Sequence, residues 1–106
     1  METDIERLYQ KIGYTIAQFV PEPWQTASVD VSIKDTVVTM QGTYVLQNDQ
    51  TQHSFPVPGS ISRMFVQLQQ LIKKDDQHLW TNARFTIYAK GDFTVEFGYS
   101  DIGKRN

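Results

Sequence analysis

Hydrophobic and polar residues alternate through two runs near the end of the chain, on either side of Lys90-Gly91-Asp92. Successive side chains of a β-strand point to opposite faces, so this alternation predicts two strands that each have one apolar face. Gly91 can adopt the positive φ that a tight hairpin turn requires. We therefore predict a β-hairpin over Trp80–Asp101 whose apolar face carries Ala83, Phe85, Ile87, Ala89, Phe93, Val95, Phe97 and Tyr99.

Two segments have a helical period instead. In residues 4–20, apolar side chains recur every three or four positions, and Pro21 and Pro23 follow, where proline ends a helix. In Ser60–Lys74 the same spacing produces a second apolar stripe. Both stripes need a surface to pack on, and the apolar face of the hairpin needs a cover. We expect the two helices to supply it.

The segment between the helices predicts three more strands. Residues alternate through Trp24–Ile33 and again through Thr36–Leu46, where Gly42 suggests a bulge or a close approach of another group. Residues 47–52 read as a polar turn. Gln52–Val57 is expected to be an edge strand, because Pro56 has no amide hydrogen for a ladder on both sides.

The element order α-β-β-β-α-β-β, with short turns, predicts an α+β fold. It would be one antiparallel sheet of about five strands with both helices on one face. The length of 106 residues suits one domain, residues 1–106, around one modest core. The other face of the sheet would remain uncovered. Its side chains would be Ser28, Asp30, Ser32, Thr39, Gln41, Thr43, Arg84, Thr86, Tyr88, Thr94 and Glu96.

Composition narrows the possible partners. Hydrophobic residues at 40% and charged residues at 21% are typical of a globular protein. The net charge is −2, and the sequence has no basic stripe of the kind that binds nucleic acid directly. A basic protein partner would suit an acidic chain better. Apolar runs are too short to span a bilayer and the N-terminus is acidic, so we expect a cytoplasmic protein without membrane contact.

The sequence has no motif of a known catalytic or metal site. It contains no cysteine, which excludes disulfides and thiolate ligands. His53 and His78 are the only histidines and are 25 positions apart, so a metal site built on them is improbable. We therefore expect no enzyme activity, no metal and no cofactor. Asp30, Arg84 and Glu96 share the uncovered face, where they form either cross-strand ion pairs or contacts with a partner.

Four aromatic residues stand out. Tyr14 falls on the polar side of the first helix and Tyr88 on the uncovered face of the sheet. Such residues either cover the stems of neighbouring charged side chains or serve as contacts, since tyrosine is enriched in binding hot spots. Trp24 and Trp80 each open a strand just after a helix, and we expect both to close the core there.

The order of these residues resembles the YezG-type immunity (antitoxin) proteins of bacterial polymorphic toxin systems. The first helix has the pattern IxxLYxxI, from Ile5 to Ile12, and is followed by Pro23 and Trp24. The closing segment has the pattern WTxxxFTIxxxGxFxxxFxYxD, from Trp80 to Asp101. The resemblance runs over essentially the whole chain. Family members are more acidic in the middle strands, so the resemblance does not identify the toxin.

The resemblance implies a stoichiometric inhibitor. Such proteins bind the C-terminal toxin domain of a secreted effector, commonly a nuclease, including effectors of contact-dependent inhibition, and protect the producing cell. A nuclease has a basic cleft for phosphates, which carboxylates and hydrogen-bonding side chains on a rigid sheet could occupy. The expected contact residues are Tyr14, Asp30, Arg84, Tyr88, Glu96 and Asp101.

A secretion chaperone for a bacterial effector is the alternative from another class. Those proteins are also small, acidic and α+β, but they usually dimerise and have a further C-terminal helix. A large exposed apolar patch would favour the chaperone.

Overall fold

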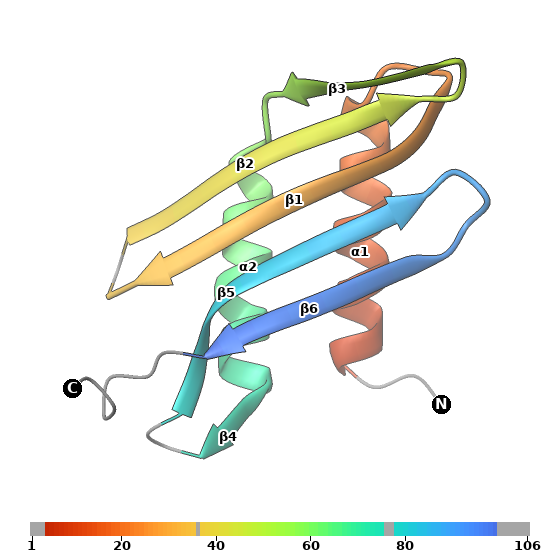
Figure 1. The fold of residues 1–106 in the computed structure, drawn as a ribbon. Helices are drawn as coiled ribbons and strands as arrows, with labels where there is room; N and C mark the ends of the chain where they lie inside the picture. Colours follow the sequence, from red (N-terminus) through yellow and green to blue (C-terminus); the bar gives the residue numbers. More distant parts are fainter. Residues whose placement is uncertain (1–3, 36, 76–77, 100–106) are drawn as a thin grey trace.

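The fold is an antiparallel sheet with two helices on one face, as Figure 1 shows. The structure is a computed structural model that describes residues 4–35, 37–75 and 78–99. The helices are α1 (Asp4–Phe19) and α2 (Ser60–Leu71). The strands are β1 (Trp24–Lys34), β2 (Val37–Leu46), β3 (Asp49–Phe55), β4 (Lys73–Asp75), β5 (His78–Tyr88) and β6 (Phe93–Tyr99).

The strands lie in the order β3-β2-β1-β5, and β5 pairs on its other side with β6 and, near its start, with β4. All pairings are antiparallel. The centre of the sheet is therefore the β1–β5 pairing, which joins segments far apart in the sequence. Both helices lie behind this sheet in Figure 1, which confirms the predicted architecture.

The core lies between the sheet and the helices. Alternate residues of β1 and β5 point into it, and Phe85 packs against the rings of Tyr9, Phe65 and Phe93, with centroids 6.0, 6.3 and 5.5 Å away. Trp80 is fully buried and Trp24 is partly buried, so both help to close the core. The buried set is Leu8, Ile12, Ile16, Val20, Ala27, Val29, Val31, Ile33, Phe55, Ile61, Phe65, Leu68, Trp80, Ala83, Phe85 and Ile87.

The apolar face of β6 is covered less completely than the sequence predicts. Phe93 is 40% exposed, and Val95 and Phe97 are half-buried. The reason is that β6 lies at the sheet edge and pairs only with β5, so its side chains have a neighbouring strand on one side only. The side chain of Tyr99 lies outside the described part of the chain.

Gly42 is a point of close approach, as predicted. It pairs in register with Val29, so there is no bulge at this position. A Cβ at Gly42 would lie 2.7 Å from two ring carbons of Phe55 and 2.8 Å from the side chain of Val57. The ring of Phe55 therefore occupies the space that a side chain at Gly42 would need.

The largest differences from the predicted boundaries are in the third strand and the second helix. β3 begins at Asp49, because the Gln47-Asn48 turn is short enough for the polar residues after it to pair with β2. It is an edge strand, as predicted, and Pro56 follows its last residue. The second helix ends at Leu71, not Lys74, because Ile72 leaves the helical conformation and Lys73–Asp75 pairs with the start of β5. This short strand β4 was not predicted.

Candidate functional site

The face of the sheet that points away from the helices is polar, and no helix among the described residues covers it (Figure 1). We call it the open face. Strand pairing arranges its side chains in rows that run across β2, β1, β5 and β6. The rows are Gln41–Asp30–Arg84–Glu96, Thr39–Ser32–Asn82–Gly98 and Thr43–Ser28–Thr86–Thr94.

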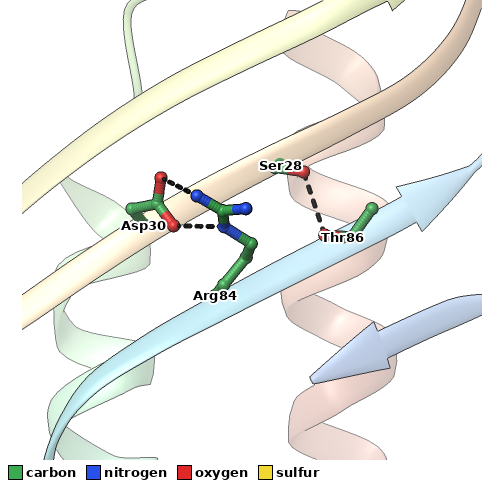
Figure 2. A network of polar contacts seen from close by, with 4 residues as sticks. All are labelled: Ser28, Asp30, Arg84 and Thr86. Carbon is green, nitrogen blue, oxygen red and sulfur yellow. Dashed lines mark hydrogen bonds and ion pairs between the residues drawn. The ribbon is translucent and has the colours of Figure 1, made fainter. Parts of the chain in front are cut away.

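An ion pair lies at the centre of the open face and bridges β1 and β5. Arg84 Nε donates to Asp30 Oδ1 at 2.7 Å and Arg84 Nη2 donates to Asp30 Oδ2 at 3.3 Å, the two-pronged contact in Figure 2. The hydrogen bonds that Arg84 donates to Asp30, then the charge of Asp30, and to a lesser extent the charge of Glu96, raise the pKa of Arg84. The two side chains remain 58% and 45% exposed, so the pair adds little stability and chiefly fixes the direction of the guanidinium.

The neighbouring row has a second cross-strand contact. The hydroxyls of Ser28 and Thr86 lie 2.9 Å apart, in hydrogen-bond contact, beside the ion pair (Figure 2). β1 and β5 are thus joined on the open face by two side-chain contacts in addition to the backbone ladder. Side chains held in this way lose less conformational entropy when a partner binds.

The open face is hollowed next to the ion pair. A depression of about 440 Å³ lies over the two rows that contain Asp30 and Ser32, and no residue of either helix lines it. The residues that lie between these two rows along each strand, such as Val31 and Ala83, point to the core. Ser32 has a small side chain and Gly98 has none, so little side-chain volume fills this part of the open face.

Tyr14 and Tyr88 lie apart from this depression. Tyr88 has the same strand parity as Arg84 but lies at the far end of β5, by the hairpin turn. Tyr14 is 68% exposed on α1, on the helical side of the sheet. Both line a second hollow of about 400 Å³ between α1 and the β5–β6 hairpin, together with Trp24 and Phe93.

The expected contact residues therefore divide among three locations. Asp30, Arg84 and Glu96 lie in one row of the open face. Tyr88 is at the edge of that face and lines one hollow with Tyr14 of α1, apart from this row. Asp101 lies outside the described residues. Sequence reasoning did not single out Asn82 and Gly98, although both share the strand parity of Arg84 and Glu96, which is the signal that places them on the open face.

His53 lies on the edge strand β3, where its side chain contacts Asp49 and Tyr44. Its Nε2 lies 3.2 Å from Asp49 Oδ2, and its ring stacks on Tyr44 with centroids 5.2 Å apart. The backbone N–H of Thr51 donates to Asp49 Oδ1 at 3.0 Å. This bond, with smaller effects from the Thr51 hydroxyl and His53, lowers the pKa of Asp49 below its usual value.

Within the described parts of the chain, no three or more histidine, aspartate or glutamate side chains gather as metal ligands would. The side chain of His78 is not among those described. Over the same residues, neither helix has the length and apolar character to cross a membrane.

Comparison with known proteins identifies one family. The family model described as "Immunity protein YezG-like" matches residues 52–106, from within β3 through α2 and the closing hairpin. No curated protein matches the chain. The first half, with the IxxLYxxI helix, lies outside the matched region. The match covers the closing aromatic segment in which the sequence resembles these proteins, and the chain belongs to the YezG-like immunity protein family.

Proposed function

We propose that this protein binds the C-terminal toxin domain of a secreted bacterial effector through the open face and neutralises it. The observation that carries the proposal is a wide polar sheet face, uncovered by either helix, in a member of an immunity protein family. An exposed sheet face without a cover is suited to contact with another protein. The partner follows from the family, because an immunity protein acts on a toxin.

The chemistry of the open face supports recognition by hydrogen bonds and charge. Hydroxyl, amide, carboxylate and guanidinium groups lie together on adjoining strands, and the central ones are held by neighbours. Arginine and tyrosine, which are enriched in protein interfaces, are represented by Arg84 and Tyr88. Tyr14 and Asp101 are proposed as contacts outside this central area.

We further propose that the toxin is a nuclease. The protein has a net charge of −2, and a nuclease cleft is basic because it binds phosphates. Because of the ion pair, we expect Glu96 to contribute more than Asp30 to the attraction of a basic partner. Since Asp30 is already engaged by Arg84, the carboxylate of Glu96 supplies the negative charge that is not neutralised within this row.

Inhibition by binding requires no turnover, and we propose that the protein is not an enzyme. The secretion-chaperone alternative would require a large apolar surface for an unfolded effector segment. The open face is predominantly polar, so it favours the immunity role.

The experiment is co-expression with the toxin domain encoded beside this gene, followed by cell growth and by binding measured with the purified proteins. Wild-type protein should restore growth. Glu96→Lys should slow association and weaken protection, because like charges would then face each other. The matched control is Asp4→Lys, which makes the same charge change at the start of α1, on the helical side. Equal protection by both variants would place the interface elsewhere, and absence of any binding by wild type would refute the immunity role.

A further inference from the structure

The depression on the open face has the dimensions and lining of a receptor for one side chain. Its volume of about 440 Å³ exceeds that of any single amino-acid side chain, so a side chain with ordered water fits. Its lining includes Ser32, Asn82, Gly98 and Glu96, together with the Asp30–Arg84 pair. The paired strands β1 and β5 form its floor, and the depression is present in the protein without a partner.

The charges around the depression do not cancel. Asp30 and Glu96 contribute two negative charges and Arg84 contributes one positive charge, which leaves one negative charge. Among the described residues, no hydrogen bond or ion pair engages the Glu96 carboxylate at contact distance. A carboxylate has about four acceptor positions, and Arg84 uses two of those on Asp30, so Asp30 can accept further bonds.

We propose that this depression receives a lysine or arginine side chain of the toxin domain, which bonds to Glu96 and to the unused acceptor positions of Asp30. The inference rests on the proposed function and specifies the partner group at the same face. Arg84 acts as a positioning residue, because its two hydrogen bonds hold the Asp30 carboxylate in place. The hydroxyl of Ser32 and the amide of Asn82 supply neutral bonding groups beside the incoming cation.

An anionic group is the competing occupant, since Arg84 has unused N–H donors. The two occupants predict opposite responses to charge removal. If a cation enters, Glu96→Gln should weaken binding to the toxin domain about tenfold or more, the effect expected when one partner of a desolvated charge pair is lost. Arg84→Gln should weaken binding less than Glu96→Gln does, because the loss of the bonds that position Asp30 is partly offset by a more negative depression. If an anion enters, Glu96→Gln should tighten binding and Arg84→Gln should weaken it, which would overturn the proposal.

A steric variant tests the location without changing charge. A Cβ at Gly98 would meet nothing closer than 3.6 Å, so Gly98→Leu should fold and fill the depression. Gly59→Leu is the matched control, because a Cβ there meets nothing within 4 Å and the residue caps α2, on the helical side of the sheet. Gly98→Leu should weaken binding at least as much as Glu96→Gln, and its effect should persist at high salt, whereas the effect of Glu96→Gln should shrink through screening. Equal toxin affinity of Gly98→Leu and Gly59→Leu would overturn the proposal while leaving the proposed function intact.

A second measurement does not depend on the toxin. The capped tripeptides Gly-Arg-Gly and Gly-Glu-Gly are titrated into the wild-type protein at low salt, and backbone amide shifts are followed by NMR. The arginine peptide should shift the amides of Ser32, Asn82 and Gly98 but not that of Thr94, and the glutamate peptide should shift none of them. Absence of shifts with both peptides, or shifts with the glutamate peptide alone, would refute the inference. If the toxin does not bind wild type, the proposed function fails and this titration alone decides the inference.

Discussion

Replacing Gly42 with alanine should destabilise the protein, although alanine is normally the better residue within a strand. The new methyl group would lie 2.7 Å from the Phe55 ring and 2.8 Å from Val57, closer than real contacts of this kind. Phe55 is only 6% exposed and cannot swing into solvent without leaving the core. Overpacking of this kind typically costs about 1–3 kcal/mol. The lower backbone entropy of alanine in the unfolded chain offsets about 0.5–1 kcal/mol of that cost.

A double-mutant cycle isolates the clash. Phe55→Ala alone should cost about 3–5 kcal/mol, because it removes a buried aromatic ring. In that background the clash with the ring is removed and only the contact with Val57 remains, so Gly42→Ala should cost less than it does in wild type. The two substitutions should therefore be non-additive, with a coupling free energy of about 1–2 kcal/mol in the favourable direction.

Urea denaturation of the four proteins, followed by circular dichroism, measures these free energies of unfolding, provided the slope m stays constant. Gly98→Ala is the control, because its new Cβ would meet its nearest neighbour at 3.6 Å, an ordinary contact distance. That variant should be as stable as wild type or slightly more so. Strict additivity in the cycle, or equal effects of the two glycine substitutions, would refute the packing argument.

Three further predictions concern titration, the sheet edge and catalysis. Because the folded-state pKa of Asp49 is depressed, chiefly by the Thr51 N–H, its contribution to stability is present above the unfolded pKa and is lost as pH falls through the folded value. The melting-temperature advantage of wild type over Asp49→Asn should thus shrink below about pH 4, and a constant difference would contradict this. Phe97→Ala should cost about 1–2 kcal/mol, less than a full core deletion, because this ring is half-buried against Trp80; a urea midpoint equal to wild type would mean that Phe97 does not pack there. The purified protein should show no hydrolysis of DNA or RNA with or without Mg²⁺, and activity that His53→Ala abolishes would contradict the inhibitor role.

The alternation of apolar residues was sufficient to predict the layers of this fold. Ala27, Val29, Val31 and Ile33 alternate without interruption in β1, and all four are buried beneath the helices. Because strand parity assigns the intervening residues to the other side, it also predicted the composition of the open face. This success has a simple physical origin, since burial of one face is the dominant energetic requirement on each strand.

The sequence pattern could not predict features that depend on which strands are neighbours. Asp30 and Arg84 were expected on one face, but their two-pronged contact depends on the pairing of β1 with β5, in register at a separation of 54 residues. The depression beside them arises where Ser32 and Gly98 fall in one row, which again requires the register. Lys73 and Lys74 continue a helical pattern locally, and pairing with β5 overrides it.

The pairing of β1 with β5 has a consequence for how the protein is made. The row Gln41–Asp30–Arg84–Glu96 draws two residues from the early strands β2 and β1 and two from β5 and β6. During synthesis, β1 and β2 leave the ribosome well before β5 and β6, and one side of β1 stays unpaired until β5 emerges. Such long-range pairings form slowly, because a long loop must close before any contact is gained. The surface proposed to bind the toxin is therefore assembled late in translation, and a nascent chain that contains only α1 and β1–β3 would lack it.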